Sequence, residues 1–186
     1  MNRLFEAAVR IQRFCDAEGW QSCIIGALAV QRWGEPRLTR DVDVSLLTGF
    51  GTEAAFIDRL LTTFAPRRSD ARAFALQYRV LLLAAGEDVP LDIALAAMPF
   101  EERCIERASD YNIAPNTAIR TCGAEDLIVL KAFAGRPQDW IDIAGIVTRQ
   151  RDRLDPRLRR SHRPRSPRME LSLHAPNRHR GCSPGT

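Results

Sequence analysis

The sequence predicts an α/β (α+β) fold in which helices alternate with short buried strands, and three observations support this prediction. Apolar residues repeat at helical spacing in several segments, beginning with residues 2–18. Short apolar runs lie between these segments and are bounded by glycine, proline or charged residues, as expected for buried strands. The apolar pattern stops at Pro156, so we expect one domain over residues 1–155 and a basic, disordered tail over residues 156–186.

Glycine and proline mark the limits of the elements in the first third of the chain. Gly19 ends the first helical pattern, Gly26 opens the second, and Pro66 stops the third, which Thr52 is placed to cap. The predicted elements are, in order, a helix over residues 2–18, a strand over 22–25, a helix over 26–32, a strand over 41–47 and a helix over 53–64.

Turn signals also divide the remainder of the chain. Residues 86–88 join two apolar runs and predict a hairpin, while residues 135–137 break the last helical pattern into two helices. The predicted elements are strands over residues 75–84 and 89–95, a helix over 100–108, a short strand over 118–121, and helices over 124–134 and 138–151.

Charge is distributed unevenly along the chain. Residues 1–150 hold 17 basic residues against 20 acidic ones, whereas residues 151–186 hold 10 arginines against three acids. The overall net charge of +4 therefore combines a body at −3 with a tail at +7. A tail of this composition cannot bury enough apolar surface to offset the entropy of ordering it.

The cysteines and the apolar runs predict the cellular environment. The five cysteines are scattered and form no C-x-x-C pair, which favours free thiols over a disulfide framework or a zinc site. No apolar run approaches the roughly 20 residues that span a bilayer, and the N-terminus lacks the pattern of a secretory signal. We therefore expect a cytoplasmic protein that does not use the membrane.

Two carboxylates in an apolar stretch are the strongest chemical signal. Asp41 and Asp43 flank Val42 and point to the same face of a strand, roughly 6 to 7 Å apart. Asp92, in the second strand of the predicted hairpin, is the candidate third carboxylate. Hard cations such as Mg²⁺ prefer oxygen ligands of this kind. A D-x-D pair alone is more often a solvated strand edge, and it is the upstream Gly26 turn and Asp92 that favour a metal site.

Four segments in order then resemble the minimal nucleotidyltransferases of the polymerase-β superfamily, with the AbiEii toxin-like group as the most similar subset. The resemblance covers about residues 5–155, and its specificity comes from the order and spacing of the segments. These segments are Ile25-Gly26-Ala27, Pro36 to Val44 around Asp41-Val42-Asp43, Leu91-Asp92-Ile93, and Ala124 to Ile143.

The resemblance implies a mixed sheet flanked by helices, an NTP donor with Mg²⁺ or Mn²⁺, and transfer of a nucleotide to an acceptor hydroxyl. Asp41, Asp43 and Asp92 would bind the metals, and Asp92 would help to activate the hydroxyl. Gly26 and Ala27 would lie against the triphosphate at a helix N-terminus. The acceptor implied is RNA, often tRNA, in a toxin–antitoxin or phage-defence setting with a cognate antitoxin or toxin.

Several basic residues have two interpretations. Lys131 lies on an otherwise apolar helix and would either serve the triphosphate or extend its amine to solvent. Arg37, Thr39 and Arg40 precede the first carboxylate and belong either to a phosphate-binding loop or to a solvated one. Arg136 and Asp139 could brace the helix junction or flank the nucleotide. For Asp142 we favour a structural role.

Alternative functions remain open at this level. The basic tail could attract RNA, could be inert, or could be the product of a shifted reading frame that replaces a family helix. The leading interpretation is the nucleotidyltransferase; the alternatives are a catalytically inactive, antitoxin-like binding protein of the same fold and an RNA-binding protein that depends on the tail. Nucleotide transfer to a small molecule such as an aminoglycoside would use the same donor site.

Overall fold

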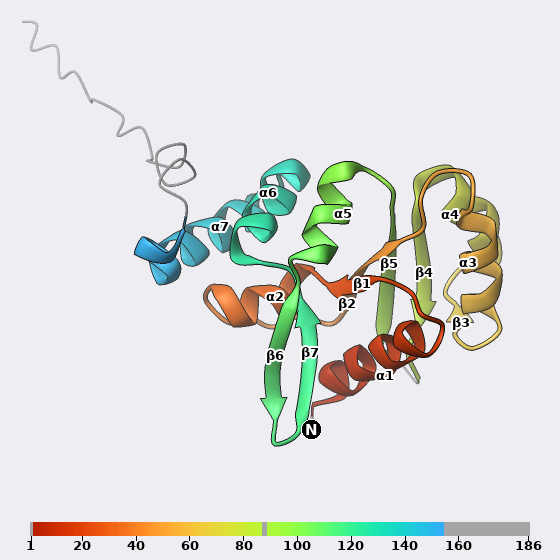
Figure 1. Cartoon of the computed structure of the whole chain (residues 1–186), viewed down its shortest axis with the longest axis horizontal. Helices are drawn as coiled ribbons and strands as arrows, with labels where there is room; N and C mark the ends of the chain where they lie inside the picture. The colour runs from red at the N-terminus through yellow and green to blue at the C-terminus, as the bar shows by residue number, and fades with distance from the viewer. Residues whose placement is uncertain (1, 87–88, 155–186) are drawn as a thin grey trace, which may run out of the picture.

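The computed structural model describes residues 2–86 and 89–154. These residues form seven strands in one sheet, with helices packed on it (Figure 1). The helices are α1 (Arg3–Ala17), α2 (Gly26–Trp33), α3 (Glu53–Leu61), α4 (Ala71–Tyr78), α5 (Pro99–Glu106), α6 (Ala124–Ala134) and α7 (Pro137–Gln150), followed by the 3₁₀ turn η1 (Arg151–Arg153). The strands are β1 (Ser22–Ile24), β2 (Val42–Leu47), β3 (Ala65–Pro66), β4 (Val80–Ala84), β5 (Pro90–Ala96), β6 (Ser109–Ala114) and β7 (Thr117–Thr121).

The sheet is mixed, and its strand order is β3-β4-β5-β2-β1-β7-β6. Strand β2 is parallel to β5 and β1 is parallel to β7, while the other neighbours are antiparallel. The predicted α/β class is therefore confirmed, as is the hairpin that brings Asp92 into the sheet beside β2.

The alternation of side chains along β2 separates an apolar core from a polar face. Val42, Val44 and Leu46 are fully buried in a cluster that includes apolar residues of α1, α3 and α4. Because successive strand residues point to opposite faces, Asp43 points away from this cluster. A second apolar cluster joins residues of α2, α5, α6 and α7. The first cluster anchors the strands, and the second anchors the helices that stand beside the polar face.

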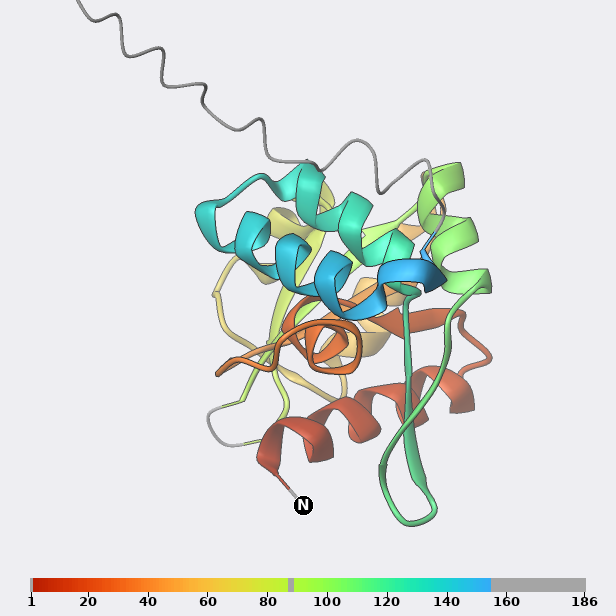
Figure 2. The ribbon, with the colours of Figure 1, turned by 90° about the vertical axis from the view of Figure 1, so that its left-hand side faces the viewer.

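Helices α6 and α7 form a hairpin that packs on α2, far from the β3–β4 edge of the sheet (Figures 1 and 2). Gly135 closes the hairpin in a left-handed conformation with φ +65°, and Pro137 starts α7 at its first position. The break between two helices was expected from the Gly135-Arg136-Pro137 sequence, and the structure confirms it.

The strand predicted over residues 75–84 is wrong in its first half. Residues 71–78 form helix α4 instead, and only Val80–Ala84 is a strand. Ala71 and Ala75 are buried one helical turn apart, and the rings of Phe74 and Tyr78 are in tilted contact at the same spacing, with centroids 4.7 Å apart. The short edge strands β3 and β6 were also missed, because their largely exposed residues carry no alternating apolar pattern.

Cys15, Cys23, Cys104 and Cys122 are free thiols buried in the core. None of the helices in the described part of the chain has the length and apolar character needed to cross a membrane. The tail predicted over residues 156–186 lies outside the described residues.

Candidate active site

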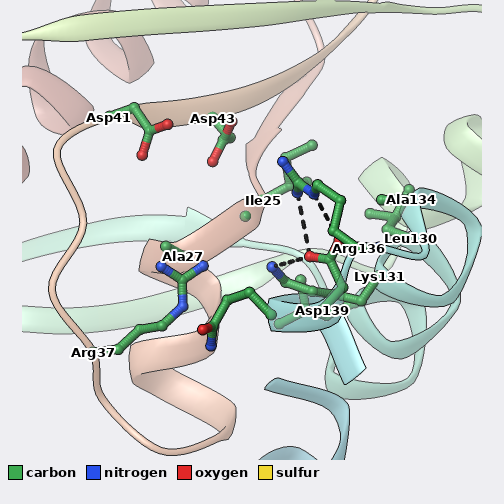
Figure 3. Close-up of a pocket in the computed structure, with 13 residues that line it drawn as sticks. Ile25, Ala27, Arg37, Asp41, Asp43, Leu130, Lys131, Ala134, Arg136 and Asp139 are labelled. Carbon is green, nitrogen blue, oxygen red and sulfur yellow. Dashed lines mark hydrogen bonds and ion pairs between the residues drawn. The ribbon is translucent and has the colours of Figure 1, made fainter. Parts of the chain in front are cut away.

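The three predicted carboxylates gather at neighbouring strands. Asp43 of β2 and Asp92 of β5 are direct partners in the parallel register, so their side chains leave the same face of the sheet. Asp41 precedes β2 by one residue, and its carboxylate points with that of Asp43 toward a pocket (Figure 3). The pocket encloses about 420 Å³ between β2, the start of α2 and the α6–α7 hairpin.

Gly26 is required by the position of Asp43. It has φ +62°, in the left-handed region, and a Cβ built on it would lie 1.9 Å from Asp43 Oδ2. Only glycine lets the backbone that enters α2 pass this close to a carboxylate. The side chain of Asp43 and the first turn of α2 therefore share one corner of the pocket.

Burial and like charge act together on this carboxylate group. Burial, together with the charges of Asp41 and Asp92, raises the pKa of the Asp43 carboxyl to about 6, although Lys131 and Arg136 oppose the change. Burial likewise raises the pKa of the Asp92 carboxyl, which Arg67 opposes. The carboxylates of Asp41, Asp43 and Asp92 therefore repel one another when no cation is bound.

The chemistry of this donor set fits a hard divalent cation. Asp41 and Asp43 offer carboxylate oxygens on one wall of the pocket, and a bound cation would offset the burial and the like charges that raise the pKa of Asp43. As they stand, no three His, Cys, Asp or Glu side chains within residues 2–86 and 89–154 form a group that could hold a metal ion. Asp92 is occupied by an ion pair with the Arg67 guanidinium.

Arg67 has no signal in the sequence, because it lies in the short polar segment between α3 and α4, which the sequence does not distinguish from a solvated turn. The structure places it directly after the edge strand β3 and in contact with Asp92. It is the functional candidate that sequence reasoning missed.

The opposite wall of the pocket is a buried charge network. Lys131 of α6 is only 4% exposed, and its Nζ lies 3.0 Å from Asp139 Oδ1 and 2.7 Å from Asp142 Oδ2. Arg136 Nε lies 2.7 Å from Asp139 Oδ2, the i,i+3 pair that would brace the helix junction (Figure 3). The interpretation of Lys131 as a residue that reaches solvent is wrong, because its partners are two buried carboxylates. Lys131 also lines the pocket, so its contact with the triphosphate stays a prediction.

The loop before β2 is tied to both walls. Arg37 Nε donates to Asp142 Oδ1 at 2.9 Å, so the loop is held against α7. Thr39 Oγ1 donates to Asp41 Oδ1 at 2.5 Å and orients that carboxylate. Arg37 lines the pocket, whereas the next residue, Leu38, is 97% exposed. The loop is thus structured by its ion pair, and its predicted contact with phosphate stays a prediction.

The charge network should make stability depend on pH in the acid range. Burial alone raises the pKa of the Asp139 carboxyl, but hydrogen bonds from Arg136 and Lys131 outweigh it and hold that pKa at about 2. A lowered pKa stabilises the fold above the unfolded value near 4, and this contribution is lost as the pH falls toward 2. We expect Asp139 to account for a loss of about 1 kcal/mol between pH 5 and pH 3. Urea unfolding at both pH values measures the loss, and an Asp139 carboxyl that titrates near 4 by NMR would contradict its cause.

With this geometry established, comparison with known proteins identifies the fold as that of nucleotidyltransferases. No protein-family profile matches the chain, and no curated protein matches it in sequence. Solved structures do match. The lincomycin-bound lincosamide antibiotic adenylyltransferase LnuA superposes with a TM-score of 0.52 at 13% identity, over 76% of this chain and 94% of that one.

Two further structures give the same result. An antigenic nucleotidyltransferase-like protein from Paracoccidioides brasiliensis has a TM-score of 0.52 at 15% identity, over 78% of this chain and 74% of that one. The antibiotic-resistance factor ANT(2'')-Ia has a TM-score of 0.51 at 16% identity, over 77% of this chain and 82% of that one. The mixed sheet with flanking helices that the resemblance implied is thereby confirmed as a nucleotidyltransferase fold.

Proposed function

We propose that the protein is a nucleotidyltransferase that moves a nucleoside monophosphate from an NTP to an acceptor hydroxyl. The observation that carries this proposal is the register of Asp43 with Asp92 on parallel strands, with Asp41 beside them and the Gly26 turn against Asp43. Carboxylates grouped in this way repel one another. Such a group of carboxylates is suited to hold a cation that also binds a polyphosphate.

Each residue then has a role that follows from its place. Asp41 and Asp43 would hold Mg²⁺ or Mn²⁺, and Thr39 fixes the orientation of Asp41. The bound cation would neutralise charge on the reacting phosphoryl oxygens and on the attacking hydroxyl. The first turn of α2, at Gly26 and Ala27, would present backbone N–H groups to the triphosphate.

The far wall of the pocket would position the donor. Lys131 and Arg136 face the carboxylates across the pocket, and their charges already act on Asp43. Arg136 is 72% exposed, and if its guanidinium turned to a phosphate, the buried Asp139 carboxylate would keep its contact with Lys131. Arg37 lines the same pocket and would add a third cationic contact.

The implied acceptor is RNA, such as tRNA, within a cytoplasmic toxin–antitoxin or phage-defence system. This part rests on the resemblance to the AbiEii-like group. The lincosamide adenylyltransferase and the antibiotic-resistance factor among the structural neighbours support a second acceptor class, a small hydroxylated drug. Both classes would use one donor site.

Transfer of α-labelled nucleotide tests the proposal. We would incubate the full chain with each α-labelled NTP and Mg²⁺ or Mn²⁺, with total tRNA, lincomycin or no added acceptor in parallel tubes. Asp43→Asn is expected to lower transfer about a thousandfold, because each 1.4 kcal/mol of lost transition-state stabilisation is a factor of ten. Asp58→Asn, which alters only an exposed ion pair with Arg72, is the matched control and should retain activity. Absence of label from every tube with folded wild-type protein would reject the proposal.

The first turn of α2 gives a further prediction. In the family that the sequence resembles, the glycine equivalent to Gly26 is usually followed by glycine or serine. This chain instead has Ala27, which is buried and lines the pocket. Ala27→Ser should raise NTP affinity several-fold, because a hydroxyl adds one hydrogen bond worth about 1 kcal/mol. Nucleotide titration of both proteins measures it, and equal or weaker binding by the variant would show that Ala27 does not limit donor affinity.

A catalytically inactive, antitoxin-like binding protein is the second candidate. The ion pair between Arg67 and Asp92 favours it, because this pair occupies the carboxylate that would complete the metal site. A folded protein that binds a cognate toxin or antitoxin protein but transfers no label would support this candidate.

A further inference from the structure

Arg67 is held at the sheet edge by its own backbone. It follows β3 directly, and its N–H donates to the Leu82 carbonyl at 3.0 Å. Its guanidinium donates to the Asp92 carboxylate. The two side chains are 33% and 31% exposed, so the pair lies at the surface, within reach of a ligand.

The Arg67–Asp92 pair lies on the far side of Asp41 and Asp43 from the donor pocket. That pocket is bounded by α2, β2 and the α6–α7 hairpin, while Asp92 lies one strand further from α2, on β5. Strands β4 and β3 come next in the sheet (Figure 1). In an in-line transfer the acceptor attacks from the side opposite the leaving group. An acceptor would therefore approach Asp92 across the edge that carries Arg67.

The partner of Arg67 would depend on whether Asp92 holds a cation. Without a cation, its guanidinium compensates the half-buried Asp92 carboxylate. A divalent cation on Asp92 would take over that compensation and repel the guanidinium. A guanidinium released at this place is at the surface and open to an anion, and its planar fork fits phosphate in particular. An acceptor that carries amines would instead be repelled.

We propose that Arg67 is the acceptor-specificity residue: it holds Asp92 in the absence of a divalent cation, and binds a phosphate group of the acceptor when the cation is present. This inference rests on the proposed function and deepens it. It assigns the acceptor to hydroxyl compounds that carry phosphate, such as an RNA end, and not to cationic aminosugars.

The exchange is tested first by cation binding, without nucleotide or acceptor. We would titrate Mn²⁺ into the full chain and into Arg67→Gln, Arg67→Lys and Arg68→Gln. Arg68 is the matched control, because it is adjacent in sequence but pairs with Asp70. Arg67→Gln should bind Mn²⁺ about tenfold more tightly than wild type, since loss of one charge-assisted contact corresponds to about that factor. Equal Mn²⁺ affinity in Arg67→Gln and Arg68→Gln would overturn the proposal.

Acceptor binding is tested next, with Mg²⁺ and a single-stranded RNA oligonucleotide over a series of salt concentrations. Arg67→Gln should bind about tenfold more weakly, and its log–log salt slope should fall by about 0.7 to 1, because one phosphate contact is lost. Arg67→Lys keeps the charge and should keep the slope. With EDTA in place of Mg²⁺, wild type and Arg67→Gln should bind alike. An unchanged slope in Arg67→Gln with Mg²⁺ would overturn the proposal.

A nucleoside monophosphate and its uncharged nucleoside, used as competitors, distinguish the source of the phosphate. Competition by the monophosphate alone, abolished in Arg67→Gln, would point to a small phosphorylated acceptor, and its absence alongside RNA binding would point to RNA. RNA binding that depends on Arg67, without any label transfer, would support this inference and reject the proposed function. Transfer to lincomycin at equal rates in wild type and Arg67→Gln would do the reverse.

Discussion

Replacing Gly26 with alanine is expected to destabilise the protein by about 3 kcal/mol and to abolish nucleotide transfer. The left-handed conformation alone costs an L-residue about 1 to 2 kcal/mol, and a steric overlap in a packed site adds about as much again. The overlap is specific, because the new Cβ would lie 1.9 Å from Asp43 Oδ2. Either the carboxylate or the start of α2 must move, and both belong to the candidate site.

Gly19 provides the matched control for this substitution. It has φ +69°, close to the +62° of Gly26, but no atom lies within 4 Å of a Cβ built on it. Gly19→Ala should therefore show the backbone cost alone, about 1 to 2 kcal/mol, with transfer unchanged. Urea unfolding and the labelled-nucleotide assay measure the two effects. Equal losses in both variants would mean that the contact with Asp43 is unimportant.

Replacing Lys131 with methionine is expected to cost about 3 to 5 kcal/mol of unfolding free energy, since it removes a buried cation that two buried carboxylates share. The Asp139 and Asp142 side chains are 1% and 2% exposed, and Arg136 and Arg37 would have to neutralise them alone. Transfer should fall as well, because α6 and α7 would no longer be fixed beside the pocket. Chemical denaturation at neutral pH is the measurement.

The surface pair between Arg59 and Glu18 is the control for Lys131. Arg59 is 48% exposed, and Arg59→Met should cost less than about 1 kcal/mol. Adding Asp142→Asn to Lys131→Met removes one of the two carboxylate charges that have lost the lysine, and it should recover part of the lost stability. Further destabilisation by this second change would show that the Asp142 charge is still compensated after the lysine is lost.

The sequence predicted the polar centre of the molecule better than its edges. Asp43 and Asp92 were found because each lies between apolar residues with a strong period-two pattern, and this pattern survives in β2 and β5. Lys131 was expected to need a partner, but the helical spacing that places Asp139 and Asp142 against it depends on the turn angle at Gly135. Arg67 could not be found, because its partner is 25 residues away and the intervening segment includes a helix that was taken for a strand.

The parallel register of β2 and β5 ties the appearance of the site to the completion of the fold. Asp43 and Asp92 are far apart in the chain, and each is flanked by residues that are fully buried, such as Val42, Val44, Leu91 and Ile93. A slip of one residue between the strands would bury a carboxylate and expose an aliphatic side chain, so a misregistered sheet is strongly disfavoured. Because pairing over such a separation forms slowly, a nascent or partly folded chain has no assembled carboxylate group. Any nucleotide transfer by this protein would thus report on chains that have reached the native register.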